Sequence, residues 1–397
     1  MGDVVENLNK SVPVGMKDFL FDDAKKRRFI ERKVTDVFES RGFYEIITPA
    51  VEYYDTFKFA DNGIGDEDMY KLFDSKGHIL ALRSDMTTPV ARVSATKLKD
   101  MPLPVKLYYN ASVFLMSENL KGRLGEIPQC GCEIIGISGI RADVEIVITA
   151  IEAIKALGIE DFKLEIGNVG FFKAIISQID KGDEFCENIR LLIENKNFAS
   201  LNSELEKYDN MPDIKILREL PYLFGGVEVL DKVSGVLKNA QALEALGHLK
   251  ELFDVLTGLG YGEYISLDLG MVHHISYYTG LVFRGYIPGS GGAILSGGRY
   301  DNLVSKFGAG LCATGFAISV ETIREKFDKK TETKEDDRVA HVINISDIPK
   351  FKSIEGDIEI SLYGDINDTL KYAAAKSKKT VLVFDGQKIS TMDLRGV

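Results

Sequence analysis

The alternation of apolar and polar residues is clearest in the middle of the first half of the chain. Two apolar runs, 105–114 and 127–137, flank a polar loop at 117–126 that carries Lys121, Gly122 and Arg123. Runs of this length between glycines and charged residues predict two adjacent antiparallel strands.

The second of these predicted strands separates polar from apolar side chains. Gln129 and Glu133 fall on one face, whereas Cys130, Cys132 and Ile134 fall on the other, because successive side chains of a strand point to opposite sides. Two interpretations remain open: the polar face meets water, or it lines a cleft for a small molecule rich in hydrogen-bond donors.

Helical and strand patterns alternate along the rest of the chain. Asp22 or Asp23 is a candidate cap for a helix that runs to about Arg41 and stops at Gly42. Further elements are a strand at 43–47, a hairpin of 70–73 with 78–82, helices at 141–157 and 169–180, and strands at 162–166 and 263–269. Pro49 places the strand at 43–47 at an edge of its sheet or at an interface.

Changes in the hydrophobic pattern along the chain predict its domain boundaries. Strand signals fade between 181 and 259, which we interpret as an inserted helical subdomain within a core formed by 1–180 and 260–327. A charged linker is expected at 328–338, followed by a small C-terminal α/β module at 339–397.

Composition narrows the class of protein. The 397 residues suggest two or three domains, and the net charge of −11 argues against broad, non-specific binding of nucleic acid. No apolar run is long enough for a membrane span and the N-terminus is no signal peptide, so a cytoplasmic protein is expected. Cys130 and Cys132 lack a second Cys/His pair at zinc spacing, and no metal or cofactor is predicted.

Two other stretches carry candidate binding residues. In the run 82–92, Asp85 and Thr87 combine a carboxylate with a hydroxyl, which suits an ammonium group. Ser84 or Asp85 could equally open a helix at Pro89, and both roles are compatible. The glycine-rich run 289–303 lacks the features of a phosphate loop.

Several motifs together resemble histidyl-tRNA synthetase, a class II aminoacyl-tRNA synthetase. The run 105–136 is similar to motif 2, 11–49 to motif 1, and 312–323 to motif 3, while 273–286 and 289–303 resemble the histidine-specific signatures. The resemblance covers about 11–327 and implies an α+β fold, with an antiparallel sheet flanked by helices and a dimer interface at motif 1.

The resemblance also implies which residues would contact histidine. The matching positions are Asp85, Thr87, Gln129, Glu133, Tyr278 and Tyr300. In that family the first two hold the amino group, and the tyrosines line the imidazole pocket, to which they offer a flat apolar face and one hydroxyl. Tyrosines of a strand can also be plain core residues.

The arginines that bind ATP in the synthetases are missing at three matching positions. They are replaced by Leu115, His273 and Thr322, although Arg123 and Arg299 remain. Losing one donor that stabilises developing charge costs roughly 10²–10³ in rate, so we expect aminoacylation to be absent.

The chain keeps the positions of the amino-acid pocket and lacks the arginines of the nucleotide site. This combination resembles the regulatory subunits of ATP phosphoribosyltransferase, a non-catalytic family that is paralogous to the synthetases. That resemblance implies a homodimer within a hetero-oligomer, with a short catalytic subunit as partner and histidine as effector. The pair would perform the first step of histidine biosynthesis under feedback inhibition. The alternatives are a divergent histidyl-tRNA synthetase, a module that senses an amino acid or tRNA, and a ligand-free homodimeric scaffold.

Overall fold

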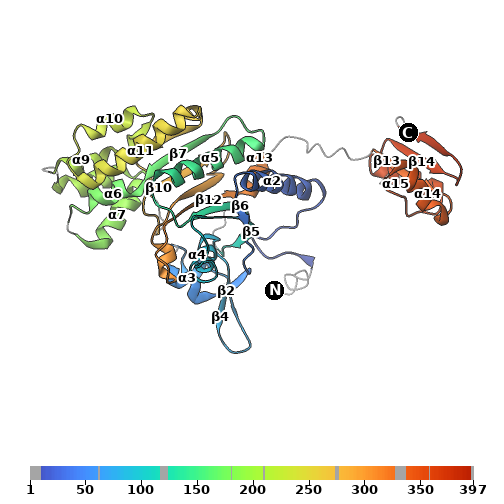
Figure 1. The fold of residues 1–397 in the computed structure, drawn as a ribbon, viewed down its shortest axis with the longest axis horizontal. Coiled ribbons are helices and arrows are strands. Elements are labelled where there is room, and N and C mark those ends of the chain that lie inside the picture. Colours follow the sequence, from blue (N-terminus) through green and yellow to red (C-terminus); the bar gives the residue numbers. More distant parts are fainter. Residues whose placement is uncertain are drawn as a thin grey trace, which may run out of the picture. The chain divides into compact units, whose positions relative to one another are not determined.

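One nine-stranded sheet forms the centre of the larger part of the chain (Figure 1). The computed structural model describes residues 10–60, 63–116, 124–179, 181–208, 211–272, 277–326, 337–356 and 358–394. The strands lie in the order β1 (Tyr44–Glu45), β5 (Val105–Phe114), β6 (Glu126–Ile135), β12 (Ala313–Ser319), β11 (Leu295–Arg299), β10 (Leu281–Tyr286), β7 (Lys163–Asn168), β9 (Ile265–Asp268) and β8 (Phe224–Gly225). Neighbouring strands are antiparallel except for the pairs β1–β5 and β7–β9, so the predicted α+β fold is confirmed with a mixed sheet.

The predicted central hairpin is present. Strands β5 and β6 pair along their whole length, with Tyr109 opposite Gly131 and Leu107 opposite Glu133. Residues 117–123 of the predicted loop lie outside the described residues. The strand predicted at 43–47 is shortened to β1, and it lies at the edge of the sheet, as Pro49 suggested.

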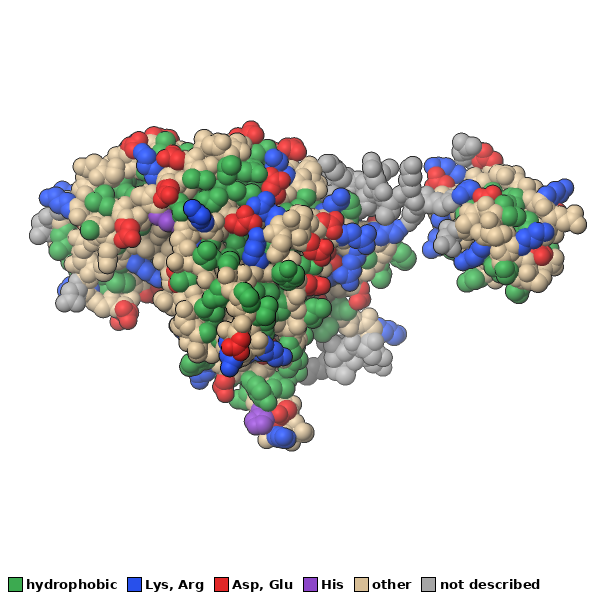
Figure 2. Space-filling model, in the orientation of Figure 1, with side chains coloured by type: hydrophobic (Ala, Val, Ile, Leu, Met, Phe, Trp, Pro, Cys, Tyr) green, Lys and Arg blue, Asp and Glu red, His purple; other side chains and the backbone are tan. Residues whose placement is uncertain are grey.

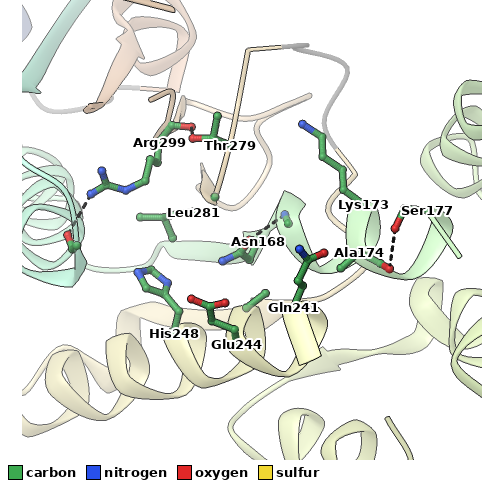
Figure 3. A pocket seen from close by; sticks show the side chains of 14 residues that line it. Asn168, Lys173, Ala174, Ser177, Gln241, Glu244, His248, Thr279, Leu281 and Arg299 are labelled. Carbon is green, nitrogen blue, oxygen red and sulfur yellow. Dashed lines mark hydrogen bonds between the residues drawn. The ribbon is translucent and has the colours of Figure 1, made fainter. Parts of the chain in front are cut away.

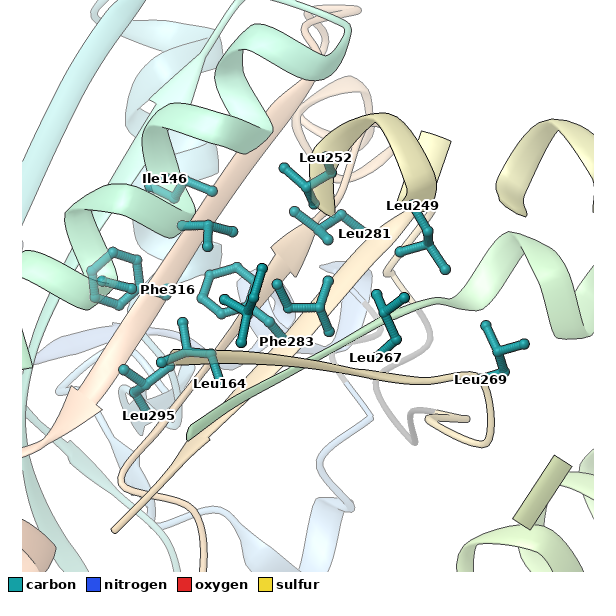
Figure 4. Packing of buried hydrophobic residues seen from close by; sticks show 14 of the residues in the cluster. Ile146, Leu164, Leu249, Leu252, Leu267, Leu269, Leu281, Phe283, Leu295 and Phe316 are labelled. Atoms are coloured by element: carbon teal, nitrogen blue, oxygen red, sulfur yellow. The ribbon is translucent and has the colours of Figure 1, made fainter. Parts of the chain in front are cut away.

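Helices α2 (Phe21–Ser40), α5 (Ile140–Ala156) and α11 (Ala240–Gly258) contribute to the core on one face of this sheet. Figure 4 shows side chains of this core, among them Ile146 from α5 and Leu252 from α11 beside Phe283 and Phe316 from the strands. Each large apolar side chain buried in this way stabilises the fold by about 1.5–3 kcal/mol.

The start of α2 differs from the prediction, whereas its end agrees. The cap residue is Leu20, without a side-chain hydrogen bond, and Asp22 and Asp23 lie inside the first turn. There the two carboxylates still favour the helix, because the N-terminus of a helix carries partial positive charge. Gly42 follows the helix at φ +80°, a conformation that favours glycine.

The opposite face carries a second core and a small sheet. Helices α3 (Tyr54–Ala60), α4 (Thr87–Thr96) and α12 (Leu303–Lys306) lie in this region, where a second core cluster includes Val90, Leu107 and Leu303. The predicted hairpin appears as β3 (Lys71–Phe73) and β4 (Ile79–Leu82), which pair with each other, and β4 also pairs with β2 (Val51–Tyr53).

The region predicted as a helical insertion is mainly helical. It contains α7 (Gly182–Glu194), α8 (Phe198–Leu205), α9 (Pro212–Glu219), α10 (Glu228–Ser234) and α11, and it follows α6 (Val169–Ile176). It also supplies β8, an unpredicted edge strand that pairs with β9. The helical region therefore adds both helices and one strand edge to the larger unit.

The C-terminal part forms a compact unit of its own, residues 330–397. Its parallel pair β13 (Arg338–Val342) and β14 (Thr380–Phe384) continues into β15 (Ile389–Asp393), accompanied by α14 (Ile348–Glu355) and α15 (Ile366–Ala375). Most of the linker predicted at 328–338 lies outside the described residues, and its last residue already opens β13. No helix among the described residues is both long enough and apolar enough to cross a membrane.

Candidate functional site

A small pocket lies against strands β6, β11 and β12 of the large sheet. Its volume is about 120 Å³, below the about 300–1,000 Å³ typical of pockets for drug-sized ligands. All six candidate histidine-binding residues from the sequence analysis line this pocket, namely Asp85, Thr87, Gln129, Glu133, Tyr278 and Tyr300. The remaining lining residues are Met86, Tyr109, Tyr277, Ser296, Gly315, Phe316 and Ala317.

The alternation on β6 determines which side chains reach this pocket. Gln129 and Glu133 line it, whereas Cys130, Cys132 and Ile134 belong to the core under the helices. Glu133 is only 1% exposed, so the interpretation of a polar face turned to water is wrong for this residue. The two cysteines are buried free thiols.

Glu133 is the most deeply buried carboxylate of the pocket. Tyr300 donates its hydroxyl to Oε2 at 2.7 Å, and Thr87 donates its hydroxyl to Oε1 at 3.1 Å. Burial is the main cause that raises the pKa of Glu133 to about 8, and the nearby Asp85 charge adds to it. The two hydrogen bonds act in the opposite sense, because they favour the ionised form.

Asp85 performs both roles that the sequence left open. Its carboxylate accepts the backbone N–H of Thr88 at 2.6 Å and the Thr88 hydroxyl at 3.0 Å, while the residue also lines the pocket. Helix α4 begins at Thr87, two residues before the expected Pro89. The pocket therefore places the carboxylate of Asp85, which favours a positively charged ligand group, beside the largely protonated carboxyl of Glu133.

Aromatic rings form the walls of the pocket. The ring centroids of Tyr277 lie 5.1 Å from Tyr278 and 5.8 Å from Tyr300, both in edge-to-face arrangements. Burial raises the pKa of Tyr278 and Tyr300 above the usual range, so both hydroxyls are neutral. Sequence reasoning missed Tyr277 and Tyr109, although the gap that Gly131 leaves opposite Tyr109 was a usable signal.

Glycine is required where the strands approach the Glu133 carboxylate. A Cβ at Gly315 would lie 1.5 Å from Oε2 of Glu133, and a Cβ at Gly131 would lie 2.4 Å from the Tyr109 hydroxyl. No side chain fits at either position unless the pocket changes shape.

Cationic side chains do not line this pocket in the described part of the chain. Leu115 is half-buried and its N–H donates to the Gly125 carbonyl, and the Thr322 hydroxyl bonds Ser319 at the start of α13 (Val320–Lys326). His273 and Arg123 lie outside the described residues. Arg299 is buried and bound by two carboxylates, those of Asp143 and Asp301.

The fold and the pocket define a class II synthetase-like protein of the histidyl type. A family model described as histidyl-tRNA synthetase matches residues 15–323. A solved structure, titled as a histidyl-tRNA synthetase from Nostoc sp. PCC 7120, has a TM-score of 0.80 at 22% identity and covers 98% of this chain and 95% of that chain. At this identity the likeness shows the fold alone.

Relatives with higher sequence identity to this chain show which family within this class it belongs to. A protein of Clostridium acetobutylicum named ATP phosphoribosyltransferase regulatory subunit is 42% identical over 92% of this chain and 93% of the relative, and one of Clostridium botulinum (strain Langeland) is 38% identical over 98% and 96%. A Bacillus halodurans structure titled "ATP phosphoribosyltransferase regulatory subunit/histidyl-tRNA synthetase" has a TM-score of 0.81 at 29% identity, covering 91% of this chain and 96% of that one. The chain belongs to the histidyl-tRNA synthetase-like family of ATP phosphoribosyltransferase regulatory subunits.

Proposed function

We propose that this chain is the histidine-binding regulatory subunit of an ATP phosphoribosyltransferase. It assembles with a short catalytic subunit, is required for the activity of that subunit and takes part in its feedback inhibition by histidine. The observation that carries the proposal is the pocket itself, which joins two carboxyl groups, an amide and tyrosine hydroxyls without a lining Lys or Arg in the described residues.

The pocket chemistry supports histidine as the ligand. Asp85 and Thr87 offer a carboxylate and a hydroxyl to the ammonium group, and the protonated carboxyl of Glu133 can donate or accept a hydrogen bond within the same cavity. Tyr278 and Tyr300 offer flat faces and hydroxyls to a small heteroaromatic ring. Gln129 adds one amide that can both donate and accept.

The same pocket supports the absence of aminoacylation. Transfer of the adenylyl group from ATP to the amino-acid carboxylate, with pyrophosphate as the leaving group, needs cationic groups around the α-phosphate. Leu115 and Thr322 replace two such groups of the synthetases, and Arg299 is already neutralised by Asp143 and Asp301. We therefore assign the phosphoribosyl chemistry to the partner subunit and expect no cofactor in this chain.

Assembly as a homodimer within a hetero-oligomer is part of the proposal. Exposed apolar side chains support it, since Tyr44 and Ile47 near β1 are 75% and 86% exposed, and Phe73 on β3 is 75% exposed. Figure 2 shows apolar side chains in the lower part of the view, where the small sheet of β2, β3 and β4 lies. Apolar side chains exposed in this number favour a protein–protein contact. We place the complex in the cytoplasm.

Co-purification with the short catalytic subunit tests the proposal. The catalytic subunit should be inactive alone, active with this chain and inhibited by histidine only in the complex. Histidine must bind the active and inhibited assemblies unequally, with a coupling of about 1–3 kcal/mol. Equal histidine affinities of the free chain and the complex would contradict the regulatory role.

Two control assays separate the alternatives. A divergent synthetase would catalyse ATP–pyrophosphate exchange that depends on histidine, which we expect to be absent. A tRNA-sensing module would shift a histidine tRNA in a gel with steep salt dependence, because phosphate contacts release counterions.

A further inference from the structure

A second and larger cavity lies between helices α6 and α11 (Figure 3). Its volume is about 580 Å³, within the range of about 300–1,000 Å³ that small-molecule pockets occupy. It shares no lining residue with the pocket around Glu133. The two cavities are therefore separate sites, and a ligand of one does not contact the side chains of the other.

The cavity exists because several side chains where the two helices face each other are small. Gly170 and Ala174 of α6 face the cavity, as do Ala245 of α11 and Gly280 before β10. Protein interiors are normally close-packed, and larger aliphatic side chains at these positions would fill the space. The small residues leave room for a molecule instead.

Lys173 places a positive charge in this cavity. Its ammonium donates to the Tyr278 carbonyl at 2.9 Å, and burial lowers its pKa. No carboxylate among the described residues forms an ion pair with it, in contrast to Arg299, which is neutralised by Asp143 and Asp301. An ammonium that is not neutralised by a carboxylate favours an anionic ligand group, because charge-assisted hydrogen bonds are the stronger ones.

Helix α11 forms the other wall of the cavity and places hydrogen-bond acceptors there. Gln241, Glu244 and His248 project from α11 toward the side where Asn168 and Leu281 lie (Figure 3). His248 contacts Asp143 at 3.0 Å, whereas Glu244 forms no ion pair within the described part of the chain. A carboxylate there favours ligand groups that donate hydrogen bonds, such as hydroxyls or amines.

We propose that the cavity between α6 and α11 is a second ligand site, for a small molecule that joins an anionic group to a body bearing hydroxyl or amino groups. Lys173 binds the anionic group, which is a phosphate or a carboxylate, and Glu244 accepts from the body. A sugar phosphate and a free amino acid are the two sources of this chemistry.

The backbone between the two cavities couples them. Tyr278 lines the pocket around Glu133, while its carbonyl accepts from Lys173 and the next residue, Thr279, lines the second cavity. An anion that draws the Lys173 ammonium away removes the bond that holds Tyr278. This coupling rests on the proposed function, since it requires histidine in the pocket around Glu133, whereas the second site itself does not.

Calorimetric titration of the full chain tests the site with three probes: ribose 5-phosphate, L-glutamine and inorganic phosphate. We expect saturable binding of ribose 5-phosphate or of glutamine, and the one that binds identifies the source of the anionic group. Inorganic phosphate alone should bind more weakly, because it lacks the hydroxyl or amino groups that would donate to Glu244. Failure of all three probes to bind at millimolar concentration would overturn the proposal.

Substitutions locate the bound probe. Lys173→Met removes the charge but keeps the length of the side chain, and it should weaken binding by about tenfold or more, as the loss of a charged hydrogen bond does. Ala245→Leu should narrow the cavity and weaken binding, whereas Lys215→Met, at an exposed lysine on α9, should leave binding unchanged. Unaltered binding to the Lys173→Met and Ala245→Leu proteins would place the probe elsewhere and overturn the assignment.

Histidine titrations of the same proteins separate this proposal from the first. Bound probe should change the histidine affinity of the wild type but not that of Lys173→Met. An unchanged affinity in the wild type would refute the coupling. If histidine fails to bind at all, the proposed function fails while the probe titrations still decide the second site.

Discussion

The carboxyl of Glu133 should make the folded protein less stable as the pH rises. Its pKa is about 8 in the folded chain and 4.5 in the reference state. Between these values the folded state holds a proton that the unfolded state has lost, so the free energy of unfolding falls with increasing pH. The stabilising proton is fully present below about pH 4.5 and is lost as the pH passes about 8.

The size of this change in unfolding free energy follows from the difference between the two pKa values of Glu133. Each pH unit corresponds to about 1.4 kcal/mol, so the contribution of Glu133 changes by about 5 kcal/mol across the window and by about 3 kcal/mol between pH 4.5 and 7. Glutamine has the same shape without a titrating proton. Glu133→Gln should therefore match the wild type near pH 5 and become more stable than it at higher pH.

Urea denaturation followed by circular dichroism measures this effect. The difference in unfolding free energy between Glu133→Gln and the wild type should grow from pH 5 to pH 8, and the difference cancels the other titrating groups that both proteins share. Glu184→Gln, at an exposed position on α7, controls for the loss of one charge. A difference that stays constant with pH would refute the assignment of a buried, protonated Glu133.

Three further predictions concern the pocket and the buried ion pair beside the second cavity. Gly315→Ala places a Cβ on the Glu133 carboxylate, so histidine binding by equilibrium dialysis should be lost; retained affinity would contradict the pocket geometry. Tyr300→Phe removes a donor to Glu133 and should lower the unfolding free energy by about 1–3 kcal/mol in urea melts, whereas no change would show that the bond is not formed. Asp143→Asn leaves the buried Arg299 without its main partner and should cost about 3–5 kcal/mol in the same assay, and a loss below about 1 kcal/mol would mean that the charge finds another partner.

Two residues of the pocket, Gln129 and Glu133, were predictable because a regular strand determines the direction of side chains. On β6 the two-residue period alone separates Gln129 and Glu133 from Cys130 and Cys132. The segment before β10 is not a regular strand, so the period does not apply there. For that reason both Tyr277 and Tyr278 line the pocket, although the sequence nominated only the second.

Other features depend on contacts between distant segments and left no local signal. Gly315 matters because β12 pairs with β6 and brings it opposite Glu133, a register that no short stretch of sequence reveals. Strand β8 has only two residues, too few for a period. The start of α2 was misplaced because Asp22 and Asp23 favour the first turn of a helix as well as its cap.

Equilibrium dialysis with radiolabelled histidine measures directly whether the pocket around Glu133 binds histidine, using the wild type, Thr87→Val and Thr96→Val. Thr87 donates to Glu133 inside the pocket, whereas Thr96 lies exposed at the end of the same helix, α4, and its hydroxyl donates to the Arg92 carbonyl. We expect one histidine bound per wild-type chain, at least about tenfold weaker binding to Thr87→Val and unchanged binding to Thr96→Val. No binding to the wild type, or equal binding to all three proteins, would contradict this expectation.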